Sequence, residues 1–330
     1  MDSHSHPGLS SKTSWWTEPV GSLVKGQKVT TVDSETTIEA ATVQLAKADV
    51  SSAPIFDQNQ NQYVGSLDWA DVAAYLLIVL KKGQPPNLSE NGSLEIQELI
   101  QRAHSFQPVP ARLAADLSSR NPLWNVTPDS TIVDVLGAFS KGIHRVCVMG
   151  PSGLEGVLSQ SALAQYLYRN SEQFAELKPV LSKTLAELGL GKQGNVVSVE
   201  ESTTVVEAIK LMVESKVSAV PIIGKSGRIL GNVSQSDIRY VILNRKVPLL
   251  YTSVLQFAHF LDQQLGMMTG QDRMPVFELP STSTLALTVA KLSAVKCHRI
   301  WVVDHGRVAG VVSFTDVLRA LAAAVPQNSM

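Results

Sequence analysis

Four segments of this chain align with one another without gaps, and this internal repetition constrains the fold more than any other sequence feature. Each segment spans 14 residues and has glycine at its third position. The segments are YVGSLDWADVAAYL, LEGVLSQSALAQYL, ILGNVSQSDIRYVI and VAGVVSFTDVLRAL, with the glycines Gly65, Gly156, Gly231 and Gly310. Repetition of this kind predicts copies of one small supersecondary unit rather than a single irregular domain.

The residues before each segment predict the same order of elements in every copy. An eight-residue apolar stretch precedes each segment across a short turn, which indicates two strands joined as a hairpin. Further upstream, a Ser or Thr cluster starts a run of apolar residues at helical spacing, as helix starts do. These runs cover 36–46, 130–139, 202–212 and 283–292. The unit is predicted to be strand, helix, strand, strand and helix.

The apolar stretches alternate in character, so the true period is two units. The first and third, VSSAPIFD and VSAVPIIG, carry small residues and proline, whereas the second and fourth, IHRVCVMG and CHRIWVVD, carry His-Arg. A unit of about 60 residues buries its sheet poorly alone, so pairing of units is expected. The prediction is an α/β fold (α+β repeats) of four units in two tandem modules, 19–170 and 178–325.

Each module is expected to contain two repeats. The repeats are placed at about 19–80, 116–170, 190–245 and 270–325. The insertion at about 81–115 is predicted to be a loop followed by an added helix. Residues 1–18, which are polar and rich in Ser and His, are predicted to be disordered.

Composition argues against several classes of protein. The net charge is −1 and no basic run exceeds Lys81-Lys82, which disfavours nucleic-acid binding. Cys147 and Cys297 have no ligand spacing, so neither a disulfide framework nor a metal site is expected. No secretory signal is found, and the apolar run 72–80 is too short to cross a membrane. We expect a soluble cytoplasmic protein, with the nucleus as a second compartment.

The second helix of a unit begins with residues suited to a nucleoside phosphate. The third copy has Ser234-Gln235-Ser236-Asp237 and the fourth has Ser313-Phe314-Thr315-Asp316. Hydroxyls and free backbone N–H groups on a first helical turn face an incoming anion. A carboxylate one turn in can accept two hydrogen bonds from the vicinal diol of a ribose. The alternative is a plain helix N-cap.

The first two copies depart from this pattern. The first copy has Asp68 and Asp71, so the acceptor is kept but the hydroxyl is replaced by a second acid. The second copy has Ser159 but Ala162, so it lacks the acceptor. The four clefts are therefore expected to be unequal.

The His-Arg pairs are the second candidate feature. They are His144-Arg145 and His298-Arg299. Arg is a bidentate partner of phosphate, and His can donate a hydrogen bond from either ring nitrogen. Two pairs at equivalent points of paired modules are predicted to converge on one central anion cluster. The alternative is an exposed pair at a strand entrance or a structural histidine.

No motif indicates catalysis. The GxGxxG match at 189–194 follows a helical run and precedes an extended one, the reverse of a dinucleotide-binding turn, so we interpret it as a helix stop and loop. No nucleophile with a matching base is found by motif. The chain is not expected to be an enzyme.

With these residues, the unit resembles the CBS repeat and the tandem pairs resemble Bateman modules. Four repeats with His-Arg in the contexts GIHRVCVMG and KCHRIWVVDHGRVAGVVSFTD resemble the gamma regulatory subunit of AMP-activated protein kinase and its plant-type sucrose-nonfermenting-related relatives. The resemblance covers about residues 20–325. It implies a flat disk, AMP, ADP or ATP as ligands and no cofactor. It also implies catalytic alpha-type and scaffold beta-type kinase subunits as partners.

The resemblance also implies roles for individual residues. Asp237 and Asp316 are expected to accept the ribose, with Asp71 as the acceptor of the first repeat. Serine and threonine side chains would contact phosphate or base, a short stretch would cradle adenine, and the His-Arg pairs would line the centre. The hydroxyl residues are Ser234, Ser236, Ser313 and Thr315, and the stretch expected at adenine is Val217-Ser218-Ala219. The pairs expected at the centre are His144-Arg145 and His298-Arg299. Ser51, where the family has a basic residue, and Asp68 predict a weak first site, and Ala162 predicts an unoccupied second site.

The function expected from the resemblance is a noncatalytic, nucleotide-responsive regulatory subunit of a heterotrimeric Ser/Thr kinase, engaged in energy sensing. Two alternatives stay open. The first alternative is a scaffold that keeps the kinase contacts but no longer senses nucleotides. The second is a free-standing CBS protein that regulates another enzyme or a transporter.

Overall fold

The four predicted repeats form four small sheets. The computed structural model describes residues 14–82, 94–192, 194, 196–269, 277–295 and 297–326. Within these residues there are four three-stranded sheets, one from each repeat. In every sheet a short first strand pairs in parallel with the middle strand, which pairs antiparallel with the third. The α/β repeat fold predicted from the sequence is confirmed.

The first two repeats have the predicted order of elements. The first consists of β1 (Val32–Asp33), α2 (Ile38–Lys47), β2 (Ser52–Asp57), β3 (Gln62–Asp68) and α3 (Trp69–Val79). The second consists of β4 (Asn125–Val126), α5 (Ile132–Ser140), β5 (Arg145–Gly150), β6 (Gly153–Ser159) and α6 (Gln160–Arg169). Between them, the insertion supplies the added helix α4 (Leu94–His104) and the 3-10 turn η2 (Ala111–Ala114), and residues 83–93 of its loop lie outside the described residues.

The last two repeats follow the same order. The third consists of β7 (Val199–Glu200), α8 (Val205–Glu214), β8 (Ala219–Ile223), β9 (Ile229–Ser234), the 3-10 turn η4 (Gln235–Asp237) and α9 (Ile238–Leu243). The fourth consists of β10 (Glu278–Pro280), α11 (Leu285–Ala294), β11 (Arg299–Asp304), β12 (Arg307–Ser313) and α12 (Phe314–Ala322). Other helical elements lie in the linkers: η1 (Trp15–Thr17), α1 (Val20–Val24), η3 (Ala175–Leu177), α7 (Lys178–Leu181), η5 (Val247–Tyr251) and α10 (Val254–Thr269).

Hydroxyl residues begin the first helix of every repeat, as the sequence predicts. The N-cap residues of α2, α5, α8 and α11 are Thr37, Thr131, Thr204 and Thr284. Glu207 completes a capping box on Thr204, which supplies partners for backbone N–H groups that a helix start leaves free. The same local chemistry therefore starts four equivalent helices.

Two apolar cores hold the repeats together, and each core joins repeats that are not neighbours in sequence. One core combines residues of the first and third repeats, where α2 contacts α9 and α3 contacts α8. The other combines the second and fourth repeats, where α12 contacts α5 and α6. Each core thus takes one repeat from each predicted module. The module limits 19–170 and 178–325 stay predictions.

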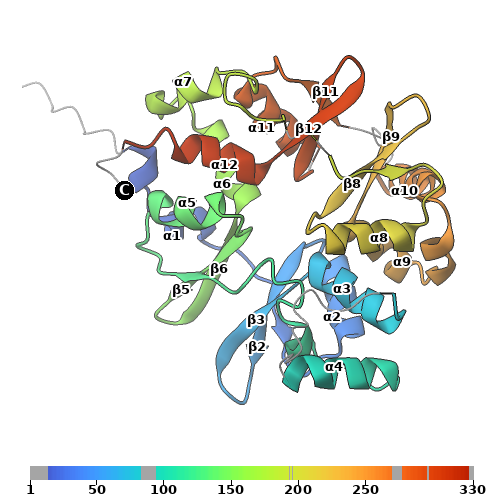
Figure 1. Ribbon diagram of the computed structural model, residues 1–330. Coiled ribbons are helices and arrows are strands. Elements are labelled where there is room, and N and C mark those ends of the chain that lie inside the picture. The colour runs from blue at the N-terminus through green and yellow to red at the C-terminus, as the bar shows by residue number, and fades with distance from the viewer. Residues whose placement is uncertain are drawn as a thin grey trace, which may run out of the picture.

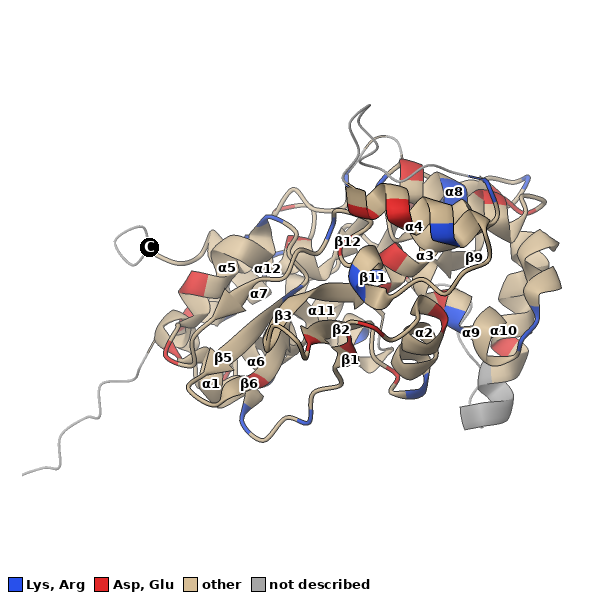
Figure 2. Cartoon of the chain, turned by 90° about the horizontal axis from the view of Figure 1, so that it is seen from below, with Lys and Arg blue, Asp and Glu red and all other residues tan. Residues whose placement is uncertain are grey.

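The four repeats surround a common centre. Figure 1 shows them in the order first, second, fourth and third around the ring, with the hairpin tips of the sheets directed outward. The view turned by 90° in Figure 2 shows a flattened body, with acidic and basic residues scattered over it. Among the described residues, no helix has both the length and the apolar character needed to cross a bilayer.

Linkers lie against the glycine that recurs at the third position of each aligned segment. A side chain at Gly65 would lie 2.6 Å from Ala115 in the first linker, and one at Gly231 would lie 3.7 Å from Ala258 in α10. Gly156 is approached by Val24 and Gly310 by the backbone of Gly191. In every copy a linker therefore approaches the sheet at its glycine. The approach excludes a side chain at Gly65, Gly156 and Gly310 but not at Gly231, where the nearest atom, of Ile222, would be in ordinary contact at 3.4 Å. The sheet has a register shift at the same place in all four copies.

The N-terminal segment differs from the sequence prediction. Disorder was predicted for residues 1–18, but within the described residues Trp15 is fully buried and Trp16 is 9% exposed. They pack edge to face, with their rings 5.6 Å apart, and η1 lies against α5. The polar residues around them hid this contribution to the core. Residues 1–13 lie outside the described residues.

We predict that Gly310→Ala will destabilise the protein by at least about 1–3 kcal/mol, because the new methyl group would collide with backbone atoms of Gly191. Gly137→Ala is the matched control, since Gly137 lies in α5 with no atom near its added methyl group, and helical Ala is favoured over Gly by about 1 kcal/mol. Urea unfolding of both variants measures the difference. Equal stability of the two variants would contradict the close approach described above.

Candidate nucleotide-binding centre

Two equivalent arginine–serine contacts join the repeats that are adjacent in sequence. Arg145 opens β5, and its Nη2 donates to Ser51 Oγ at 2.6 Å. Arg299 opens β11, and its Nη2 donates to Ser218 Oγ. Each arginine comes from an even repeat and each serine from the small-residue stretch of the odd repeat before it. The alternation seen in the sequence thus corresponds to a physical contact.

The two histidines lie directly before these arginines and are crowded by protein. Burial, followed by the charge of Arg145, lowers the pKa of His144 to about 3. Burial, followed by the charges of Arg299 and Arg145, lowers the pKa of His298 to about 4. The side chain of His298 is nevertheless exposed to solvent on one side. Both rings are neutral at pH 7, where they can each donate one hydrogen bond and accept another.

The His-Arg pairs of the two modules lie close enough to act on each other. Besides burial and Arg145, the charge of Arg299 lowers the pKa of His144, and the charge of Arg145 acts likewise on His298. Burial, followed by the charge of Arg120, lowers the pKa of Arg299 to about 10. We call the set Arg120, His144, Arg145, His298 and Arg299 the central cation cluster. Its residues come from both predicted modules, whereas the convergence of the two pairs on an anion stays a prediction.

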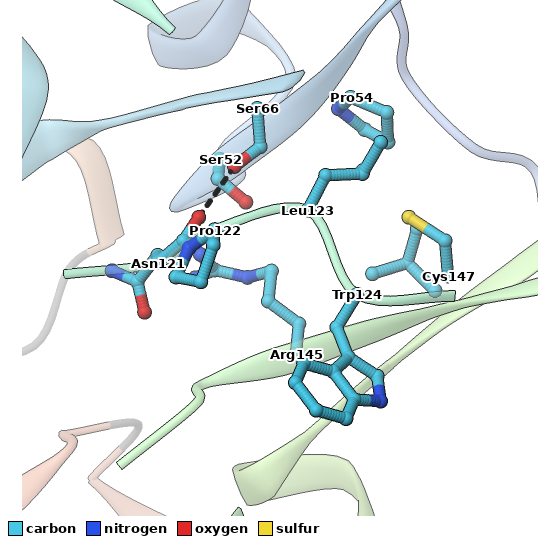
Figure 3. A pocket seen from close by; sticks show the side chains of 10 residues that line it. Ser52, Pro54, Ser66, Asn121, Pro122, Leu123, Trp124, Arg145 and Cys147 are labelled. Carbon is cyan, nitrogen blue, oxygen red and sulfur yellow. Dashed lines mark hydrogen bonds between the residues drawn. The ribbon is translucent and has the colours of Figure 1, made fainter. Parts of the chain in front are cut away.

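The cleft between the first two repeats is nearly closed. Its cavity of about 20 Å³ is lined by Ser52, Pro54, Ser66, Asn121, Pro122, Leu123, Trp124, Arg145, Cys147 and Val157. Figure 3 shows Arg145 reaching from β5 toward Asn121, while Ser66 Oγ donates to the Asn121 carbonyl at 2.9 Å. This space holds about one water molecule, so a nucleoside would enter only after side chains move.

The third repeat has the carboxylate best placed to accept a further ligand. Asp237 is 4% exposed and closes a capping box, because its Oδ2 accepts from the backbone N–H and the hydroxyl of Ser234, both at 2.8 Å. Its Oδ1 has no hydrogen bond within the described part of the chain. One oxygen of Asp237 can therefore cap the helix while the other accepts hydrogen bonds from a ribose, so the two interpretations of this residue do not exclude each other.

The carboxylates of the fourth and first repeats, Asp316 and Asp71, have protein contacts at both oxygens. Asp316 Oδ2 caps Ser313, and its Oδ1 lies 3.3 Å from Arg319 Nη1. Asp71 is 1% exposed and uses both oxygens, accepting from the backbone N–H groups of Asp68 and Ser118 at 2.9 Å. Burial, followed by the charge of Asp68, raises the pKa of Asp71 well above its usual range. Asp71 is thus engaged in holding the backbone.

The remaining predicted residues surround the clefts. Ser236 Oγ lies 3.0 Å from Ser234 Oγ at the start of η4, and Thr315 Oγ1 donates to Gln160 Oε1 of the second repeat at 3.1 Å. Ser218 lies between Val217 and Ala219 at the entrance of β8, where its carbonyl accepts from Gln235. Their roles toward a nucleotide stay predictions.

Sequence reasoning missed two residues of this region. Arg120 belongs to the central cation cluster, and Asn121 Nδ2 donates to Asp68 Oδ2. Both lie in the linker before β4, outside the aligned segments, so no repeat partner drew attention to them. In the part of the chain that the structure describes, no group of His, Cys, Asp or Glu is arranged to hold a metal ion.

A larger cavity of about 490 Å³ lies away from the centre. It is bounded by α3, α4 and α8 and lined by Ile78, Lys81, Lys82, Ile100, His104, Lys210 and Glu214. The insertion helix α4 forms one of its walls. Cavity size alone therefore does not identify the cleft that the motifs indicate.

Comparisons with known proteins agree with the repeat assignment. The CBS domain model matches the chain four times, at residues 20–78, 114–169, 192–244 and 267–323. Protein SDS23 of Eremothecium gossypii is 30% identical over 302 residues, which cover 88% of this chain and 60% of the relative. Protein SDS24 of Saccharomyces cerevisiae is 28% identical over 322 residues, covering 94% and 59%. The chain thus spans about 60% of the length of these relatives.

A solved structure shares the whole arrangement. Protein MJ1225 of Methanocaldococcus jannaschii, described as a candidate archaeal homologue of g-AMPK, superposes with a TM-score of 0.68 over 92% of this chain and 99% of its own, at 13% identity. Identity at this level supports the fold alone. The two curated relatives are SDS proteins rather than kinase gamma subunits, so the resemblance to gamma subunits holds at the level of four CBS repeats and their arrangement.

We predict a pH dependence from His144. Free histidine has a pKa of about 6.5, whereas that of His144 in the folded chain is about 3. Between these values the unfolded chain binds a proton that the folded chain does not. The free energy of unfolding should therefore fall as the pH decreases through this window, by at most about 1.4 kcal/mol per pH unit from this residue.

The measurement is urea unfolding of the wild type and of His144→Gln at several pH values between about 4 and about 7. This range covers most of the interval between the pKa of His144 in the folded chain, about 3, and that of free histidine, about 6.5. The variant should show a shallower slope than the wild-type protein. His305→Gln is the control, because its side chain is 95% exposed. If wild type and His144→Gln have equal slopes, His144 is hydrated in the folded protein.

Proposed function

The chain belongs to the CBS-domain family, and on this premise we propose that it is a noncatalytic regulatory protein that binds adenine nucleotides between its modules. The observation that carries the proposal is the meeting of the two His-Arg pairs from different modules in one central cation cluster. A guanidinium group binds phosphate through two parallel N–H donors, that is, in a bidentate manner. A nucleotide phosphate there would compensate like charges that otherwise repel one another.

The third-repeat cleft is the strongest candidate for the nucleoside. Asp237 Oδ1 is available to a ribose diol, while Ser218 and Ala219 lie at the entrance of the neighbouring strand β8. The fourth cleft is second, because Asp316 shares its Oδ1 with Arg319. The first cleft is disfavoured, since Asp71 has both oxygens engaged and the adjoining cavity measures about 20 Å³.

Regulation would follow if the ligand favours one arrangement of the modules over another. Arg145 and Arg299 each contact a serine of their own module while facing the shared centre. An anion held by both arginines would fix the distance between the modules. The effect on a partner is limited by how differently AMP, ADP and ATP bind the two arrangements.

For the partner, we propose first a heterotrimeric Ser/Thr kinase, with this chain in the place of the gamma-type subunit and alpha-type and beta-type subunits beside it. The support is the His-Arg pattern in the second and fourth of four repeats. A scaffold without energy sensing and a regulator of another enzyme are the other outcomes that the experiments below distinguish.

We predict that Asp237→Ala will weaken nucleotide binding about tenfold to a hundredfold, because two hydrogen bonds from ribose to a charged oxygen are lost. Calorimetric titration with AMP, ADP and ATP measures the affinity. Asp134→Ala is the matched control, since Asp134 closes the same kind of capping box on Thr131 at an exposed helix start. No heat with any of the nucleotides, or equal loss in both variants, would remove the proposal.

We also predict that the tagged full chain, expressed in its native cells, will co-purify the catalytic and scaffold subunits of one Ser/Thr kinase. Mass spectrometry of the purified complex identifies the partners, and kinase activity of the complex is then measured with added AMP or ATP. The double variant Arg145→Gln/Arg299→Gln should keep the partners but lose the nucleotide response. A complex without a kinase rejects the gamma-type role, and a kinase complex indifferent to nucleotide rejects sensing.

A further inference from the structure

The side-chain amide of Gln160 has one possible orientation. Gln160 is the first residue of α6 and is 6% exposed. Its Nε2 donates to the backbone carbonyls of Phe139 at 2.9 Å and Ile143 at 3.0 Å. Carbonyl oxygens only accept hydrogen bonds, so exchanging the amide nitrogen and oxygen would place acceptors against acceptors. The other amide atom, which lies 3.1 Å from Thr315 Oγ1 of the fourth repeat, is therefore the oxygen.

This orientation decides the direction of the hydrogen bond between Gln160 and Thr315. An amide oxygen carries no proton, so the Thr315 hydroxyl is the donor. A hydroxyl has a single proton and two acceptor lone pairs. While this bond exists, Thr315 can accept from a ligand but cannot donate to an ionised phosphate oxygen, which only accepts. A phosphate contact at Thr315 therefore competes with Gln160.

Gln160 also contacts the His-Arg pair of the second repeat. Its backbone N–H donates to the His144 carbonyl at 3.0 Å, and Ile143, whose carbonyl accepts from Gln160 Nε2, directly precedes His144. Thr315 lies in the first turn of α12, one residue before Asp316. One glutamine thus links the helix start at the fourth cleft with the entrance of β5 in the other module.

The interface between the first and third repeats lacks this bond. In the aligned segments, Gln235 is the equivalent of Gln160. Gln235 is 2% exposed and its N–H donates to the Ser218 carbonyl, but its Oε1 is buried without a hydrogen-bond partner in the described part of the chain. The equivalent of Thr315 is Ala70 of α3, which contacts η4 but has no hydroxyl to donate. The link is therefore specific to the second and fourth repeats.

We propose that Gln160 is a positioning residue that couples phosphate binding in the fourth-repeat cleft to the interface between the second and fourth repeats. The inference rests on the proposed function and adds a regulatory contact to that site. A phosphate bound at the start of α12 takes the Thr315 proton, which leaves Gln160 Oε1 buried without its donor. Phosphate binding there therefore releases a contact that holds the second repeat to the fourth, whereas the first and third repeats have no such contact to lose.

Calorimetric titration of the full chain with AMP and with adenosine tests the competition. All variants carry Asp237→Ala, which suppresses the third cleft. Gln160→Met removes the acceptor and frees the Thr315 proton, so AMP should bind about threefold to tenfold more tightly, while adenosine, which has no phosphate, should bind as before. With Thr315→Val in addition, Gln160→Met should bring no gain. Gln235→Met is the matched control and should leave AMP affinity unchanged, because Gln235 Oε1 has no donor to release.

Urea unfolding without ligand tests the hydrogen bond itself. Gln160→Met and Thr315→Val remove the same bond, so the double variant should lose less free energy of unfolding than the two single variants together. Additive losses would overturn the proposal, and so would unchanged or weaker AMP binding by Gln160→Met or an equal gain for adenosine. If the losses are not additive but neither AMP nor adenosine binds, the bond exists, and the proposed function and the regulatory role are rejected together.

Discussion

The burial of apolar helix faces across the module boundary determines the rest of this structure. Each repeat has only three strands and two helices, which cover one another poorly. Packing α2 and α3 of the first repeat against α9 and α8 of the third buries one set of faces, and packing α5 and α6 against α12 buries the other. These two cores close the ring seen in Figure 1 and direct the entrances of β5 and β11 toward its centre. The positions of the two His-Arg pairs are thus a consequence of core formation.

Closing the ring also concentrates positive charge. Burial lowers the pKa values of Arg145, Arg299 and Arg120, and the charge of Arg120 adds to this effect on Arg299. Asp68 and Asp71 offset part of the effect at Arg145 and Arg120. The serine hydroxyls of Ser51 and Ser218 solvate one N–H group each without neutralising any charge. The lowered pKa values of His144 and His298 keep both rings neutral at pH 7 and in mild acid as well. The centre therefore combines buried guanidinium groups with pKa values lowered by burial, a combination that is frequent at functional sites.

Repetition explains how much of this was predictable from sequence. Strand and helix order, the threonine caps and the pairing of His-Arg with small residues all recur, and each recurrence supports the others. What does not recur was missed: Arg120 lies in a linker, and Trp15 lies among polar residues that suggested disorder. The joining of the first repeat to the third depends on faces far apart in sequence, for which local patterns carry no signal. The recurring glycines were visible, but the linker that approaches each of them was not.

The capping boxes show how one residue type can serve structure in one repeat and remain available for a ligand in another. A carboxylate has two oxygens, and capping a helix occupies one of them. Asp237 makes only the capping contacts with the described residues. The second oxygen of Asp316 lies 3.3 Å from Arg319 Nη1, and the second oxygen of Asp71 accepts from the Ser118 N–H. The linker before β4 supplies that last contact, and the same linker carries Arg120 into the centre. One linker segment therefore both fills space beside the first cleft and places a further guanidinium group near Arg299, so two features of the centre have a common structural origin.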